Sequence, residues 1–123
     1  LETSDLGQSF AKATATFLRD NAADFQCYPV AVAAACGDAG IGKQAALLAF
    51  LQAFSNNLIA VAVRLIPLGQ TRGLEVMRDL MPIITETARR AMASSLDDLG
   101  SSTLLSDIAA MKHETQYSRV FRS

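Results

Sequence analysis

The stretch that decides the fold is QAALLAFLQAFSNNLIAVAV, residues 44–63, an uncharged run in the middle of the chain. From this run to Leu65 just beyond it, apolar residues recur in alternating steps of four and three, a seam that comprises Leu47, Leu51, Phe54, Leu58, Val61 and Leu65. Such spacing marks one face of an α-helix, and Leu48, Phe50 and Ile59 widen that face. The pattern predicts a long central apolar helix with neighbours on more than one side.

The same run is long enough to cross a bilayer, so a membrane span is the alternative interpretation. Its polar residues argue against crossing, because Gln52, Asn56 and Asn57 would lie near the bilayer centre, where unpaired amides are costly. We therefore expect a buried helix of a globular protein and no membrane partner.

Helical spacing continues on both sides of this run. Ser4 to about Asp20 predicts a first helix with Ser4 as N-cap, and Tyr28-Pro29 begins a second helix that the glycines from Gly37 to Gly42 end. Pro67 and Gly69 end the central helix.

Beyond that turn, a further helical face includes Leu74, Met77, Met81, Ile84, Ala88 and Met92. Pro82 lies inside it and predicts a kink or two helices, because its ring nitrogen cannot donate to the carbonyl of Arg78. Leu104, Ile108 and Met111 mark a last short helix. No alternation long enough for a sheet is visible, so the predicted class is all-α, a compact helical bundle over residues 1–123.

The composition bounds the function classes. The chain has 123 residues, enough for one domain, and its 11 Lys and Arg against 12 Asp and Glu leave a net charge of −1, which does not favour nucleic acid as a partner. Cys27 and Cys36 are too few for a disulfide framework, which fits a reducing cytoplasm. The chain opens with Leu1 and lacks the features of a signal peptide, so we expect a piece of a longer protein.

Residues 37–43, GDAGIGK, satisfy the first seven positions of the P-loop pattern, but Gln44 replaces the hydroxyl that would hold Mg²⁺. A P-loop also needs a preceding strand, for which Val30-Ala31-Val32 is the candidate, and no further strand-helix units follow. A nucleotide-binding ATPase fragment is therefore an alternative, and a Gly-rich helix connection is preferred.

A nickel-binding chaperone that uses Cys27, Cys36 and His113 is a second alternative, although these ligands have no recognisable spacing. His113 is also the only imidazole available to a catalytic triad, and Asp97-Asp98 suit a cap or turn better than an acid and base pair. We predict no catalytic residues, no metal site and no cofactor.

The C-terminal tail, residues 114–123, combines aromatic and guanidinium groups with no residues left to build a core. Tyr117 and Phe121 are four positions apart, so one helical turn would place both on one side, as anchors of a protein interface. A frayed terminus is the alternative.

The stretch HETQYSRVFRS, residues 113–123, preceded by DIAAMK, residues 107–112, closely resembles the C-terminus of the UreF family of urease accessory proteins. Three upstream segments resemble the same family in the same order, namely YPVA at 28–31, RLIPLGQ at 64–70 and DDLG at 97–100. The resemblance implies an all-α protein of roughly twice this length, from which the N-terminal helices are missing here.

The resemblance also implies a function. UreF-like proteins bind UreD (also called UreH), dimerise and recruit the GTPase UreG in the complex that delivers nickel to apo-urease, without being enzymes themselves. Carried over to this chain, the UreD-facing residues are Gln116, Tyr117, Ser118, Arg119, Phe121 and Arg122. The turn formed by Pro67, Leu68, Gly69 and Gln70 is the candidate surface for UreG or urease, with a purely structural turn as the alternative.

Overall fold

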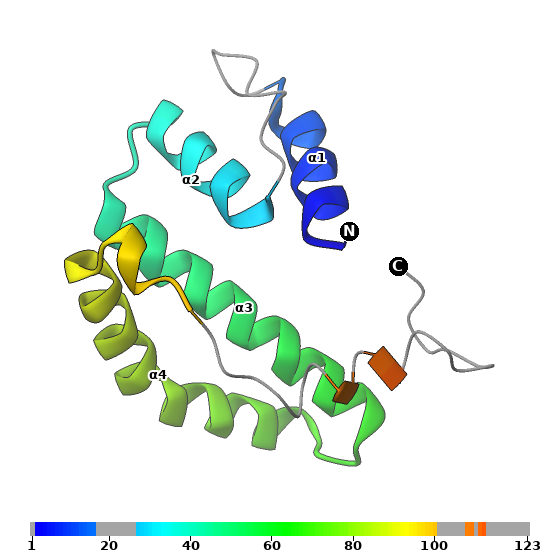
Figure 1. Ribbon diagram of the computed structural model, residues 1–123. Helices are drawn as coiled ribbons and strands as arrows, with labels where there is room; N and C mark the ends of the chain where they lie inside the picture. Colours follow the sequence, from blue (N-terminus) through cyan, green and yellow to red (C-terminus); the bar gives the residue numbers. More distant parts are fainter. Residues whose placement is uncertain (1, 17–26, 101–107, 110, 113–123) are drawn as a thin grey trace.

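The computed structural model describes residues 2–16, 27–100, 108–109 and 111–112, and every regular element in these residues is helical. The order is α1 (Glu2–Thr14), α2 (Tyr28–Asp38), α3 (Lys43–Leu65), α4 (Gln70–Ala93) and the short 3₁₀ helix η1 (Leu96–Asp98). Figure 1 shows α1 beside α2, and α3 paired with α4 in a long helical hairpin. The predicted all-α bundle is confirmed.

The first helix begins earlier than predicted. α1 starts at Glu2, so Ser4 lies within the helix and the expectation that it is the N-cap is wrong. The helix ends at Thr14, whose hydroxyl donates to the carbonyl of Phe10 at 2.8 Å, and a turn follows through Thr16. The remainder of the predicted segment, to Asp20, lies outside the described residues.

The second helix begins where Tyr28-Pro29 predicted it. Cys27 takes an extended conformation as N-cap. Pro29 occupies the first turn, where backbone N–H groups have no acceptor within the helix, so the missing N–H of proline costs no hydrogen bond. The helix runs one residue past Gly37, to Asp38, and the chain then turns through Gly40, whose φ of +71° suits glycine.

The central helix α3 ends just before Pro67, as predicted. It starts at Lys43 after Gly42 and ends at Leu65, and Ile66 is extended because a residue before proline avoids the helical conformation. Gly69, with a φ of +75°, then leads directly into Gln70, the first residue of α4.

Pro82 lies within one continuous helix, so of the two predicted outcomes the structure shows the bend and not the break. Figure 1 shows α4 bending between the part that follows the turn after α3 and the part that ends near the start of α3. Proline lacks the N–H that the carbonyl of Arg78 would accept, and a bend relieves its clash with the preceding turn.

Close helix crossings hold the two helical pairs together. Gly7 of α1 lies against the backbone of residues 27 and 28, and a Cβ at this position would approach Cys27 C and Tyr28 N to 2.9 Å. Gly73 of α4 lies against α3, and a Cβ at Gly73 would approach the side chains of Val63 and Ile59 to 3.0 and 3.2 Å. The ring of Tyr28 joins the pairs, with centroids 5.5 Å from Phe10 and 6.0 Å from Phe50.

The described residues bury little. Ala31, Ile84 and Ala88 are the apolar side chains that are buried, and α3 buries none of its residues. The expectation of a buried central helix is therefore wrong for this chain, because α4 covers one face of α3 and α2 contacts it mainly near its start. Among the described helices, α3 is also the one whose length and apolar composition would suffice to cross a membrane.

Candidate functional site

The glycine-rich connection joins two helices and is not a P-loop. Val30, Ala31 and Val32 belong to α2, so helix and not strand precedes the glycines, and Lys43 begins α3. A P-loop lies between a buried strand and a helix in a parallel sheet, and no strand occurs in the part of the chain that the structure describes. The nucleotide-binding alternative therefore loses its structural context.

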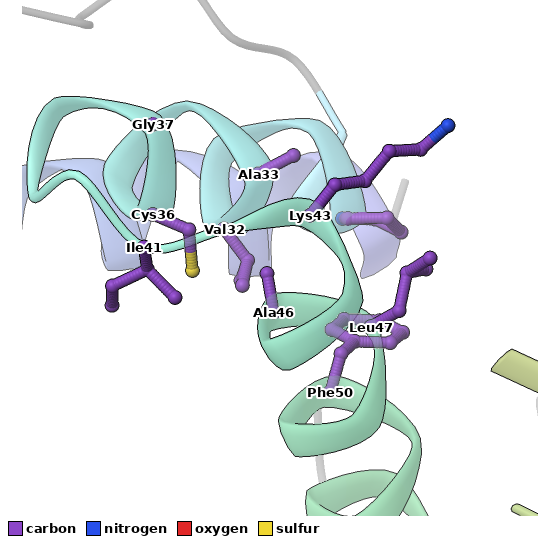
Figure 2. Close-up of a pocket in the computed structure, with 10 residues that line it drawn as sticks. Val32, Ala33, Cys36, Gly37, Ile41, Lys43, Ala46, Leu47 and Phe50 are labelled. Carbon is purple, nitrogen blue, oxygen red and sulfur yellow. The ribbon is translucent and has the colours of Figure 1, made fainter. Parts of the chain in front are cut away.

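The connection instead borders an apolar cavity of about 370 Å³ between α2 and the start of α3, which Figure 2 shows. Val32 and Cys36 line it from α2, and Leu47 and Phe50 from α3. Lys43 lies at the rim with its amino group directed away from Ile41 and Cys36. The cavity suits an apolar side chain, with one positive charge at its edge.

The two cysteines cannot share a metal ion. Cys27 is the exposed N-cap of α2 and Cys36 is half-buried near its other end, nine residues later, so about 13 Å of helix separates them. His113 lies outside the described residues, and within them no three His, Cys, Asp or Glu side chains gather closely enough to hold a metal ion. The three-residue nickel site proposed from sequence thus lacks the geometry for its two thiols to act together.

The turn between α3 and α4 is exposed at Pro67, Gly69 and Gln70 and half-buried at Leu68. The backbone N–H of Leu68 donates to the carbonyl of Ile66 at 2.6 Å, which tightens the turn. Gln70 also lines a second cavity of about 260 Å³ with Gly73 and Leu74. The turn is positioned by both helices, as a surface for a partner requires, and a structural role explains the same geometry.

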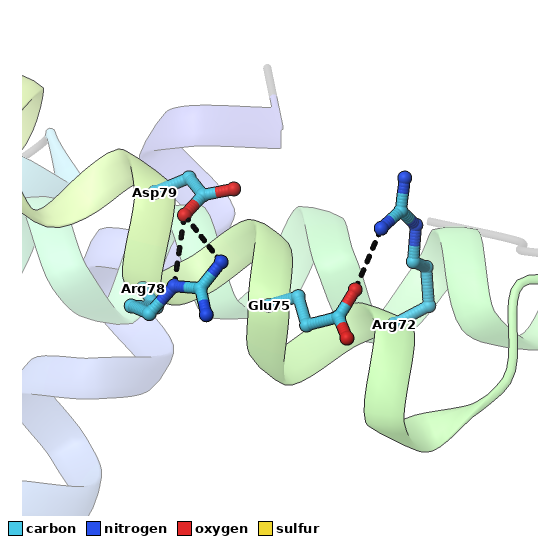
Figure 3. A network of polar contacts seen from close by, with 4 residues as sticks. All are labelled: Arg72, Glu75, Arg78 and Asp79. Atoms are coloured by element: carbon cyan, nitrogen blue, oxygen red, sulfur yellow. Dashed lines mark hydrogen bonds and ion pairs between the residues drawn. The ribbon is translucent and has the colours of Figure 1, made fainter.

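Ion pairs join most of the charged side chains on the exposed side of α4. Arg72 pairs with Glu75 at 2.6 Å and Arg78 with Asp79 at 2.9 Å, as Figure 3 shows. Closer to the end of the helix, Arg89 pairs with Glu86 at 2.6 Å, and its hydrogen bond lowers the pKa of the Glu86 carboxyl below the ordinary value. Exposed pairs contribute little to stability, and because anions pair with Arg72, Arg78 and Arg89 these cations form no basic patch for a polyanion.

The acidic pair Asp97-Asp98 serves local structure. The backbone N–H of Ser95 donates to Asp98 Oδ2 at 2.8 Å, and the Ser95 hydroxyl lies 3.1 Å from the same oxygen, a capping box that starts η1. These bonds, the backbone one foremost, lower the pKa of the Asp98 carboxyl. The prediction that this pair forms a cap or turn is confirmed.

The predicted tail site lies outside the described residues. Its members are Gln116, Tyr117, Ser118, Arg119, Phe121 and Arg122. Their role in binding UreD therefore stays a prediction.

Sequence reasoning missed an exposed apolar surface on α3. Phe54, Leu58 and Leu65, three positions of the seam expected to be buried, are 58%, 57% and 53% exposed. The signal was present in the sequence, since the apolar face is wider than one neighbouring helix can cover. We call the residues Leu47, Leu51, Phe54, Leu58, Val61 and Leu65 the α3 seam.

Comparison with known proteins identifies the family, because the UreF family model matches residues 1–81. The chain belongs to the UreF family. The match begins at residue 1, ahead of the segments that carry the resemblance, and it ends before the similar segments at 97–100 and 107–123.

Curated UreF relatives extend the similarity to the whole chain. The urease accessory protein UreF of Roseobacter denitrificans is 45% identical over 122 residues, which are 99% of this chain and 54% of that protein. The protein of the same name from Brucella ovis is 53% identical over 96 residues, 78% of this chain and 42% of that protein. The Rhizobium leguminosarum protein is 46% identical over 99% of this chain and 56% of its own length.

The chain thus spans about half the length of the curated UreF relatives that it matches. No solved structure matches it.

Proposed function

We propose that this UreF-family chain acts in urease maturation as a helical adaptor that brings other proteins together and catalyses no reaction itself. The observation that carries the proposal is the family match over residues 1–81, with relatives named urease accessory proteins aligned over 99% of the chain. The described polar groups support it, since the carboxylates of Glu75, Glu86 and Asp98 are engaged in ion pairs and a cap.

The partners in this proposal are those that the family resemblance implies. UreD (UreH) binds the tail through Gln116 to Arg122, UreG or apo-urease meets the turn at Pro67 to Gln70, and the adaptor is a homodimer in the cytoplasm. Nickel passes to urease through the complex, with no metal ligand and no cofactor contributed by this chain.

The tail carries the UreD proposal on chemical grounds. Tyr117 and Phe121 supply large apolar contact areas at low cost in conformational entropy, and Arg119 supplies a planar charged group, which are the residue types that dominate interface energetics. The turn carries the second contact because two packed helices hold its backbone in place and leave Pro67 and Gln70 exposed.

Co-purification with a UreD homologue tests the tail. A version that ends at Thr115 is expected to lose UreD, and Tyr117→Ala to weaken the association by ~1 to 3 kcal/mol, the cost of removing an interface anchor. Leu96→Ala is the matched control, because Leu96 is 82% exposed on η1 and no partner is assigned to it. Equal retention of UreD by the shortened and complete chains would refute the tail assignment.

Retention of UreG tests the turn in the same preparation. Gln70→Arg adds bulk and charge at the exposed first residue of α4, and we expect it to reduce UreG binding while UreD remains bound. Thr71→Arg is the control, since neighbouring helical positions point about 100° apart and Thr71 is equally exposed. Equal loss of UreG from both variants, or from neither, would contradict the assignment.

A further inference from the structure

The cavity between α2 and the start of α3 has the size and the lining of a small-molecule site. Its volume of about 370 Å³ falls within the range of about 300 to 1,000 Å³ in which such sites occur. Lys43 is the one charged residue among those that line it. Apolar walls with a single polar group are typical of a site that buries a hydrocarbon and orients it by one contact.

The walls of this cavity offer almost no hydrogen bonds. Figure 2 shows Val32 and Cys36 of α2 and Ala46 of α3 directed toward the space between the two helices. The ring of Phe50 also lines it, and its contact with Tyr28, at 6.0 Å between centroids, holds this wall in place. A thiol is a weak donor, so the body of a ligand gains nothing here from polar groups.

The charge at the rim of the cavity is positive. Lys43 makes no ion pair with any residue that the structure describes, and Asp38, at the end of α2, does not belong to the lining. The first turn of α3 contains no acidic residue, so nothing in it offsets the partial positive charge of its N–H groups. The flexible stem of Lys43 lets its amino group follow a ligand at the rim. A negative head group is therefore favoured over a neutral or positive one.

The length of the cavity limits the ligand. Its lining on α2 extends from Pro29 to Gly37, about 12 Å along the helix axis. A zigzag alkyl chain of about ten carbons, with bonds of about 1.5 Å, has a similar length. We propose that this cavity binds the alkyl chain of a medium-length fatty acid, with the carboxylate at Lys43.

Calorimetric titration of the 123-residue chain tests the proposal with hexanoate, octanoate and decanoate as probes. We expect decanoate to bind saturably at one site. Affinity should rise along the series by up to about fourfold for each methylene group, because each one removes further apolar surface from water. Decanol and decylamine carry the same alkyl chain with a neutral and a positive head group, and both should bind more weakly than decanoate.

Two substitutions separate the alkyl contact from the charge contact. Ala46→Phe places a ring in the cavity and should weaken decanoate binding ~10-fold or more, since the space is filled. Lys43→Met keeps an unbranched side chain and removes the charge. It should weaken decanoate binding up to about fivefold, as for an exposed ion pair, and should leave decanol binding unchanged.

Ala49→Phe is the matched control for the filled cavity. Ala49 is exposed on α3 and does not line the cavity, so this variant should bind decanoate within ~2-fold of the unmodified chain. Circular dichroism should show the same helicity for all variants. If Ala46→Phe lowers the helicity, Ala33→Phe replaces it, because Ala33 lines the cavity from α2 and is exposed.

Several results would overturn the proposal. Absence of saturable decanoate binding, or equal binding by the filled-cavity variant and the Ala49→Phe control, would remove the cavity as the site. Decanol or decylamine binding as tightly as decanoate would remove the carboxylate, and would leave an apolar space of the kind that a partner's side chain fills. These titrations contain no UreD, UreG or urease, so their outcome does not depend on the adaptor proposal.

Discussion

Replacing each of three glycines with alanine tests which helix contacts have no room for a methyl group. At Gly7 the new Cβ would lie 2.9 Å from two backbone atoms, Cys27 C and Tyr28 N, which cannot rotate away. At Gly73 it would meet the methyl groups of Val63 and Ile59, whose side chains can shift. At Gly37, within α2, nothing lies within 4 Å.

The magnitudes follow from two opposing terms. Alanine gains up to about 1 kcal/mol over glycine within a helix, and Gly37→Ala should show this gain without any opposing contact. Overpacking a close contact costs typically about 1 to 3 kcal/mol, so Gly7→Ala should be destabilising by about 0 to 2 kcal/mol after the gain is subtracted. Gly73→Ala should fall between the two.

Urea unfolding followed by circular dichroism at 222 nm measures the order of the three variants. The free energies of unfolding of the three variants are compared with one another, so an error in the value for the unmodified chain cancels. A Gly7→Ala chain as stable as the Gly37→Ala chain would refute the close approach of α1 to the start of α2. Equal destabilisation by all three substitutions would refute the reasoning from neighbouring atoms altogether.

Three further outcomes are expected. The pKa of the Asp98 carboxyl is lowered by the Ser95 N–H, so this cap contributes stability above the unfolded-state pKa of about 3.9 and loses it as pH falls through the lower folded value. A carboxyl NMR titration should place the Asp98 midpoint lower in the folded chain than in urea, and equal midpoints would contradict the cap. Fluorescent nucleotide with Mg²⁺ should show no micromolar binding, and binding that Lys43→Ala abolishes would restore the P-loop interpretation. Maleimide should modify the exposed Cys27 before the half-buried Cys36, and the reverse order would contradict the position of Cys36 in the cavity wall.

Local signals in the sequence were sufficient for the start of α2 and the end of α3. Pro29 at the start of α2 and Pro67 after α3 act on the backbone of their own segments, so they predict boundaries without knowledge of the fold. Ser4 misled because a capping residue type is not a cap when helical residues precede it.

Burial could not be predicted from periodicity alone. The seam spacing says that Phe54 and Leu58 face a common neighbour, but not whether the neighbour belongs to the residues at hand. Neither could the two cavities be predicted, since they depend on how α2 and α4 cross α3. The glycine-rich connection shows the same limit, because its pattern resembles a P-loop until the helical state of the preceding residues is known.

The exposed amides of α3 distinguish between the environments that an uncharged helix can occupy. Gln52, Asn56 and Asn57 are exposed in this chain, and placing such groups unpaired in hydrocarbon costs several kcal/mol each on the cyclohexane scale, about 4 to 8 kcal/mol. Lipid on all sides would impose that cost three times, whereas a protein neighbour that covers only the α3 seam leaves the amides in water. The division of α3 into an apolar seam and a separate polar side therefore favours a protein neighbour over a bilayer. Although α3 has no acidic residue, its amides still require water on one side of the helix.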